Sequence, residues 1–213
     1  MKMKTTLTLS LLALCAGCGG TPANNVSASQ NNSGLPVPVE RPATQTAEGN
    51  GQAAMPAGLD CVRNRLSSEQ RQGVVQAAME QVDQEDSRAQ VLIRAVDACG
   101  EELSWSPEKR RLAAMFSMSA AGATGLRQAL GGQGIQVQQL DETILSDRAL
   151  MMAAENNQLD SDAGRSFASR HRAELERVAA GQSLNGEVGS RIGNYIAFIA
   201  VAQTAATRFA SAS

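Results

Sequence analysis

The stretch that decides the fold is residues 105–132, WSPEKRRLAAMFSMSAAGATGLRQALGG. Ser106 is suited to cap a helix, Pro107 to take its first position, and Glu108 to place a negative charge in its first turn. Apolar and small residues then fall on one face of a helix, at Leu112, Met115, Phe116, Ser119, Leu126 and Leu130. Gly131-Gly132 ends the pattern. The spacing therefore predicts one long amphipathic helix.

Three helical segments are predicted before this one. Leu59, Val62 and Leu66 form one face of a short helix. Ser67 and Gln70 match a capping box, and apolar residues follow at helical spacing up to Val82. Asp86-Ser87 can cap the next helix, whose apolar stripe ends at Cys99.

Further helices are predicted after residue 132. Ile135–Leu140 alternates apolar and polar residues, but a single strand would have no partner, so we expect a loop there. Helices are then expected from Asp141 to about Asn156, over 164–179, and over 186–209. The last is apolar nearly all round between residues 192 and 206, which is too short to cross a bilayer and is typical of a buried central helix.

Small residues on two of these helices predict a close contact. Gly122 and Gly125 lie on the long helix, and Gly189, Gly193 and Ala197 lie on the last one. Glycine inside a helix costs about 1 kcal/mol relative to Ala, which a close approach of the two backbones would offset. We expect these two patches to face each other, so that Gly193→Leu would severely destabilise the fold.

These patterns predict an all-α bundle of about six helices over residues 59–213. The formal net charge of −2 provides no basic surface for nucleic acid, and the aromatic content of 3% provides few rings for stacking on bases or sugars. No nucleic-acid partner is expected.

The N-terminus has the pattern of an export signal. Two lysines precede an apolar run over 7–16, too short to span a bilayer unaided. Ala16-Gly17-Cys18 at its end resembles the lipobox of bacterial lipoproteins, although Cys15 stands where that box usually has Leu. The resemblance implies that residues 1–17 are a signal peptide and that Cys18 is lipidated. Cleavage without lipidation, or an uncleaved anchor, are the alternatives.

The segment that follows predicts a flexible tether. Residues 18–58 are rich in polar and small residues and hold five of the six prolines. Such a composition favours disorder. Gly19, next to the lipobox cysteine, lacks the Asp that retains many lipoproteins at the inner membrane. The resemblance therefore implies a periplasm-facing domain anchored in the membrane, with the outer membrane favoured.

Two cysteines, Cys61 and Cys99, lie in the predicted helical domain. In an exported domain a pair of thiols favours a disulfide. A redox or metal pair is the alternative, but neither residue belongs to a Cys-x-x-Cys motif and a single histidine cannot complete a zinc set. We expect a structural bridge and neither metal nor cofactor.

Trp105 and His171 are the two candidate contact residues for a ligand or partner. Trp105 precedes the long helix, where its ring could either pack against the disulfide or contact a ligand. His171 lies on an apolar stripe with Phe167 and Leu175. It is expected to be half-buried beside a polar partner, and the sequence around it holds no Gly-x-Ser-x-Gly nucleophile turn. No catalytic residue is predicted.

Three functions remain open from the sequence. The first is a non-enzymatic envelope lipoprotein that acts through contact with another envelope protein. The second is a module that binds an apolar ligand, with Met115, Met118, Met151 and Met152 lining an adaptable pocket. The third is a cell-wall hydrolase using Glu101 or Glu102 beside Trp105, although such enzymes usually need a deep cleft with aromatic residues.

Overall fold

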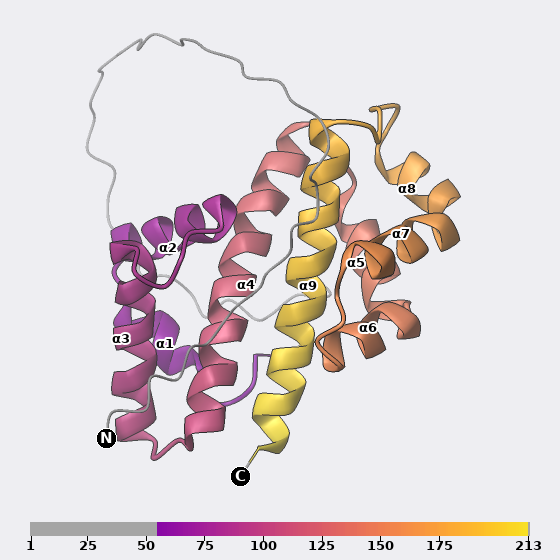
Figure 1. Cartoon of the computed structure of the whole chain (residues 1–213). Coiled ribbons are helices and arrows are strands. Elements are labelled where there is room, and N and C mark those ends of the chain that lie inside the picture. Colours follow the sequence, from indigo (N-terminus) through magenta and orange to yellow (C-terminus); the bar gives the residue numbers. More distant parts are fainter. Residues whose placement is uncertain (1–54, 213) are drawn as a thin grey trace, which may run out of the picture.

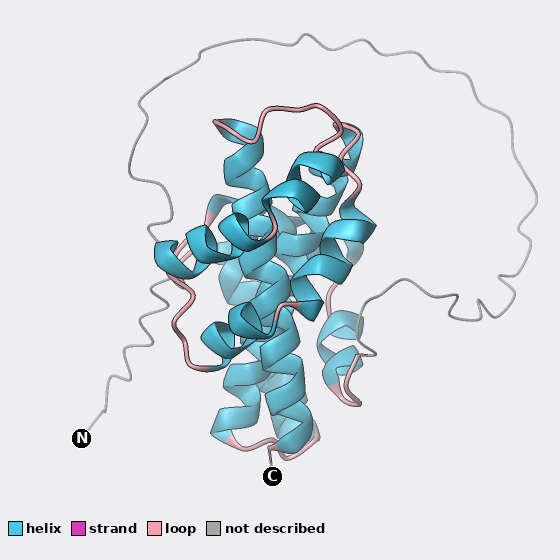
Figure 2. Cartoon of the chain, turned by 90° about the vertical axis from the view of Figure 1, so that its right-hand side faces the viewer, coloured by secondary structure: helices cyan, strands magenta, loops and turns pink. Residues whose placement is uncertain are grey.

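The structure, a computed structural model, describes residues 55–212, and all regular secondary structure in this range is helical (Figure 2). The predicted signal peptide, Cys18 and nearly all of the tether lie outside the described residues. The helices are α1 (Leu59–Arg65), α2 (Ser68–Glu80), α3 (Ser87–Glu102), α4 (Pro107–Gly132), α5 (Val137–Ser146), α6 (Arg148–Glu155), α7 (Ser161–Arg170), α8 (Arg172–Val178) and α9 (Glu187–Ser211). The all-α class is confirmed, but the expectation of about six helices is wrong, since this part of the chain forms nine.

The difference arises where a polar residue interrupts a predicted helix. The helix expected over 141–156 breaks at Asp147, whose carboxylate accepts from the backbone N–H of Leu150 and so caps α6. The helix expected over 164–179 breaks at His171, between α7 and α8. The loop expected over 135–140 is also wrong in part, because α5 begins at Val137.

The predicted helix starts of α2 and α4 are confirmed. Ser67 accepts a hydrogen bond from the backbone N–H of Gln70, and the Gln70 side chain accepts one from the backbone N–H of Ser67. At α4, the Ser106 hydroxyl accepts from the backbone N–H of Lys109, with Pro107 in the first turn. These bonds satisfy backbone donors that a helix start otherwise leaves unpaired.

The long helices α4 and α9 form the centre of the molecule (Figure 1). They run side by side in opposite directions, with α1, α2 and α3 beside α4 and the short helices α5–α8 beside α9. The prediction of a buried central last helix is confirmed, since α9 packs on α4, α5 and α6. No described helix is both long and apolar enough to cross a membrane.

The described core consists of two apolar clusters. One lies among α4, α5–α8 and α9 and includes Phe167 and Tyr195. The other lies among α1–α4 and the end of α9 and includes Trp105 and Phe209. Both clusters use residues of α4 and α9, so these two helices join the two sides into one body.

The predicted contact between glycine patches is wrong in its detail. A Cβ at Gly122 would lie 2.6 Å from the Phe198 ring of α9, so α4 and α9 do approach closely there. Gly125 instead faces Val75 and Met79 of α2, and a Cβ at Gly193 would meet nothing within 4 Å. Because Gly193 is exposed, the severe effect predicted for Gly193→Leu does not follow.

Candidate functional site

The predicted disulfide is present and belongs to the core. Cys61 of α1 and Cys99 of α3 are joined, with their Cα atoms 6.0 Å apart, and Cys99 is fully buried. Trp105 lies in the same cluster, and its ring meets Phe209 edge to face at a centroid distance of 5.1 Å. The exposed fraction of Trp105 is only 8%. Trp105 thus holds the start of α4 against α1 and α9 and offers little surface to a partner.

His171 belongs to a polar cluster centred on the buried Asp147. The Nε2 atom of His171 lies 2.7 Å from Asp147 Oδ2, and Arg170 donates two hydrogen bonds of 3.0 Å to the same carboxylate. Phe167 covers the imidazole, with ring centroids 4.7 Å apart. Since Asp147 also caps α6, this cluster ties α6 to the junction of α7 and α8.

Opposing effects set the charge of Asp147. Burial raises the pKa of its carboxyl group, whereas the backbone N–H of Leu150 and the side chains of His171 and Arg170 lower it. The net effect is a pKa below the ordinary value of an aspartate. Asp147 is therefore a carboxylate at neutral pH. It can accept hydrogen bonds that join helices, but it holds no proton to donate as a general acid.

A second buried carboxylate, Asp141, lies between α4, α5 and α9. Tyr195 donates a hydrogen bond of 2.6 Å to one oxygen, and Arg127 donates one of 2.7 Å to the other. Burial, and then the bond to Asp141, raise the pKa of the Tyr195 hydroxyl far above its ordinary value. The phenol therefore stays protonated as a donor, and Asp141 joins three helices instead of facing an open cleft.

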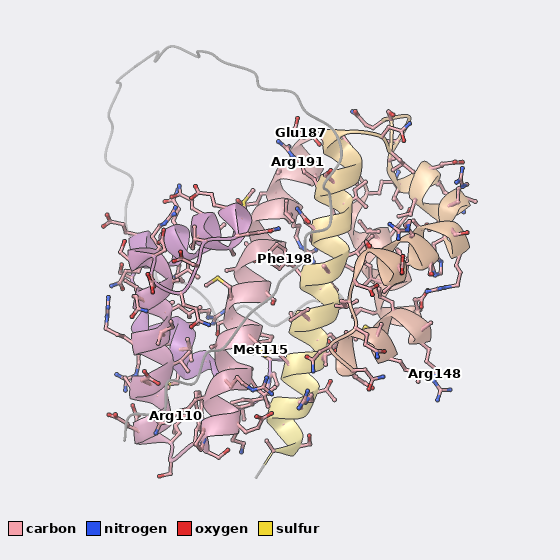
Figure 3. All side chains as sticks on the ribbon, viewed as in Figure 1. Arg110, Met115, Arg148, Glu187, Arg191 and Phe198 are labelled. Atoms are coloured by element: carbon pink, nitrogen blue, oxygen red, sulfur yellow. A yellow bond between two sulfur atoms is a disulfide. The ribbon has the colours of Figure 1, made fainter. Side chains whose placement is uncertain are left out.

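A groove of about 900 Å³ lies elsewhere in the described structure, bounded by α3, α4 and α9. The end of α2 and the turn after it close one end, and the loop between α6 and α7 borders one side. Figure 3 shows Met115 on α4 and Phe198 on α9 in the middle of the molecule, with Arg110 nearer one end. We call this space the α3/α4/α9 groove.

The middle of the α3/α4/α9 groove is apolar. Met115 and Met118 of α4, Val201 of α9 and Ile93 of α3 line it and are all partly exposed. Thr204 of α9 also lines it, and its buried hydroxyl has no hydrogen-bond partner in the described structure. A buried polar group without a partner costs about 1–3 kcal/mol. The packing of the described helices therefore gives no reason for a hydroxyl group at Thr204.

Arginines gather at the end of the groove where α4 begins and α9 ends. Arg110 lies 4.0 Å from Asp97, and its Nε donates to the carbonyl of Trp105. Arg111 and Arg208 both contact the same carboxylate, Glu108, at 2.8 and 3.3 Å. Three guanidinium groups therefore share two carboxylates at this end.

Most of the sequence-predicted site residues lie away from this groove. Trp105 and His171 do not line it and belong to separate clusters on opposite sides of the molecule. Of the four methionines, Met115 and Met118 line it, whereas Met151 packs on the cluster around Phe167 and Met152 is exposed. Two of the four methionines therefore line the groove and the other two do not.

The pair considered for a hydrolase does not form a cleft. Glu101 and Glu102 are exposed at the end of α3, and Glu102 forms an ion pair with Arg65. Neither lines the α3/α4/α9 groove. In the described part of the chain, no group of three or more His, Cys, Asp and Glu side chains is placed to hold a metal ion.

No protein-family model matches this sequence. No curated protein and no solved structure shows a significant similarity to it.

The observed roles of three residues described above were not predicted from the sequence. Asp141 was expected to cap a helix, but it lies inside α5 and is buried. Asp147 has a local sequence signal, because aspartate is one of the residues preferred at the N-cap of a helix. Thr204 gave no signal, because a threonine in an apolar helix normally bonds to the carbonyl four residues earlier, as Thr207 does.

Proposed function

We propose that this protein is a membrane-tethered, non-enzymatic module of the bacterial envelope that binds another envelope protein through the α3/α4/α9 groove. The observation that carries the proposal is the groove itself, whose apolar middle is left partly exposed by three helices. An exposed apolar surface rimmed by charges is typical of a contact surface. The lipobox-like Ala16-Gly17-Cys18 supports the tether and the location.

The two buried carboxylates support a role without catalysis. Asp141 and Asp147 each accept hydrogen bonds from groups on other helices, and neither lines the groove. A general acid or base must reach a proton of the substrate. Both aspartates are instead used to hold the fold together.

A second candidate function is the binding of an apolar small molecule in the same groove. Met115 and Met118 favour it, because the flexible thioether side chain adapts to ligands of different shape. The arginines at one end of the groove favour a protein partner with acidic side chains. One experiment can separate the two candidates.

The test is a photo-crosslinking amino acid placed at Met118 in the full-length protein, in cells of its native host. We expect a discrete adduct with one envelope protein, identified by mass spectrometry. The matched control places the same amino acid at the exposed Gln128, on the same helix but outside the groove. That control should give no such adduct.

Two variants show whether the adduct depends on the groove. Val201→Glu adds a charge inside the groove and should abolish the adduct at Met118, while Thr207→Glu adds one on the exposed side of the same helix and should preserve it. Circular dichroism confirms that both variants fold. An equal adduct at Gln128, or insensitivity to Val201→Glu, would refute the proposal, and an adduct with lipid alone would favour the second candidate.

A further inference from the structure

The α3/α4/α9 groove is lined by three helical stripes that meet around one space. On each helix the lining includes a set of residues with the i, i+3, i+4, i+7 spacing of a face that packs on another helix. The stripes are Ala89, Leu92, Ile93 and Val96 on α3, Arg111, Ala114, Met115 and Met118 on α4, and Phe198, Val201, Ala205 and Arg208 on α9. Each helix therefore presents a packing face to the groove.

The arrangement of these helices leaves a position for another one. In Figure 1, α4 lies between α3 and α9, and it packs against both. The α9 stripe extends from Phe198 to Arg208, ten positions further along the helix, or about 15 Å at 1.5 Å per residue. That is the length of nearly three helical turns, and a helix in this position would cover the partly exposed methionines.

We propose that the α3/α4/α9 groove receives an amphipathic helix of a partner protein, about three turns long, with carboxylates in its last turn. This inference rests on the proposed function and names the kind of partner. Its apolar face would have residues at i, i+3, i+4 and i+7, as in other complexes in which a helix lies in a groove.

The arginines determine the direction in which the helix docks. Arg110, Arg111 and Arg208 lie at one end, and the hydrogen bonds they make within the described structure use only part of the five N–H donors of each guanidinium. Guanidinium groups bind carboxylates in a bidentate geometry, and the last carbonyls of a helix also need donors. The C-terminal end of the docked helix therefore lies at the arginines, and the helix runs antiparallel to α4.

Thr204 adds a second, independent constraint. Its hydroxyl is buried in the wall of the groove with no partner, whereas Thr124 and Thr207 bond to carbonyls of their own helices. Because this hydroxyl is buried, a polar side chain on the docked helix, such as Asn or Gln, would pair with it only once the Thr204 side chain rotates toward the groove. The Thr204 hydroxyl is unpaired in the free protein and would be paired in the complex. This difference favours a partner with a polar group on its face over a purely apolar occupant.

Three fluorescein-labelled peptides of about fifteen residues test the inference against the full-length protein. The acidic peptide has leucines at i, i+3, i+4 and i+7, one Asn on that face, two glutamates in the last turn and a free C-terminus. The basic peptide has two lysines in place of the glutamates and an amidated C-terminus. The scrambled peptide has the composition of the acidic one without its spacing.

Fluorescence anisotropy should show the acidic peptide binding roughly tenfold more tightly than the basic one, a difference that salt reduces. The scrambled peptide should not bind. Met118→Glu should abolish binding, whereas Gln128→Glu, which adds the same charge to α4 outside the groove, should not change it. Replacing Arg111 and Arg208 by Gln should remove the preference for the acidic peptide.

Thr204→Val separates a role of Thr204 in binding from a role in folding. It should keep or raise the melting temperature while weakening binding of the acidic peptide, because it removes an unpaired hydroxyl that the peptide satisfies. Equal affinity of the acidic and basic peptides, or no binding by either, overturns the inference.

Failure of the inference is distinguishable from failure of the proposed function. If the adduct at Met118 persists in cells and remains sensitive to Val201→Glu, the proposed function stands even when the peptides show no preference. If no peptide binds, while dodecanoate binds the wild-type protein and not Met118→Glu, the occupant is an acyl chain and not a helix.

Discussion

At the scale of single residues, the most connected side chain is Asp147. It is almost fully buried, caps α6 and binds both Arg170 and His171, so one carboxylate joins α6 to the junction of α7 and α8. The helices α5–α8 on this side are short, and a short helix is only marginally stable without contacts to other helices. Their positions therefore depend strongly on this contact.

Asp147→Asn should lower the free energy of unfolding by about 1–3 kcal/mol, the usual value for hydrogen bonds to charged groups. Asparagine still caps a helix, so the change removes the charge more than the cap. Asp162→Asn is the control, because the ion pair of Asp162 with Arg165 is exposed and should contribute less than about 1 kcal/mol. Urea unfolding at neutral pH measures both, and equal losses would contradict the expectation.

The same variant has a pH dependence with a definite sign. Because the pKa of Asp147 is lower in the folded protein, its contribution is present at pH values above the ordinary pKa of 3.8 and is lost as the pH falls through the folded value. The wild-type protein should therefore lose more stability than Asp147→Asn between about pH 5 and pH 2. Urea midpoints across this range would test it, and parallel curves would exclude Asp147 as a cause of acid unfolding.

At the scale of elements, the contact of α4 with α9 requires a glycine at Gly122 and does not involve two facing glycine patches. A Cβ at Gly122 would lie 2.6 Å from the Phe198 ring, and the ring is buried between the two helices. Gly193 has open space around it and lies on the exposed side of α9. A side chain at Gly122 would therefore clash with Phe198, whereas a side chain at Gly193 would meet open space.

The pair predicts opposite outcomes for the same substitution. Gly122→Ala should destabilise the protein by about 1–3 kcal/mol, because the added methyl group forces the Phe198 ring to move. Gly193→Ala should stabilise it by about 0.5–1 kcal/mol through helix propensity alone. Thermal unfolding followed at 222 nm compares them, and a loss of stability in Gly193→Ala would disprove the open environment.

The elements also show what the sequence could and could not predict. Local signals located Ser67, Ser106 and the long helices, because caps and apolar periodicity act within a few residues. The break at Asp147 has a local signal, since Asp147 caps α6 through the backbone N–H of Leu150. The break at His171 has none, because His171 bonds to Asp147, which lies 24 positions away in the sequence. The α3/α4/α9 groove combines three helices, and only Met115 and Met118 gave a hint of it in the sequence.

At the scale of the whole molecule, the disulfide fastens α1 to the body of the domain. Cys61 and Cys99 are separated by 38 positions, and α1 otherwise packs only on α3 and α4 among the larger described contacts. In the chain-entropy model a loop of this size stabilises by about 4 kcal/mol.

Replacing both cysteines by alanine should therefore lower the free energy of unfolding by about 3–4 kcal/mol. Urea unfolding of this variant and of the oxidised wild-type protein measures the difference. Wild-type protein treated with a reductant should approach the stability of the variant. A reduced protein as stable as the oxidised one would show that the crosslink contributes nothing to the fold.

The edge-to-face pair of Trp105 and Phe209 has a consequence for the order in which the chain folds. A polypeptide leaves the ribosome, or a translocation pore, with its N-terminus first, so residues 59–113 are present long before Ala205 and Phe209, which complete their cluster. Until those last residues emerge, Trp105 has no cover on one side and the half-made domain exposes apolar surface. Emergence of Ala205 and Phe209 thus completes this cluster, and a nascent chain stalled just before residue 205 should remain a substrate for chaperones.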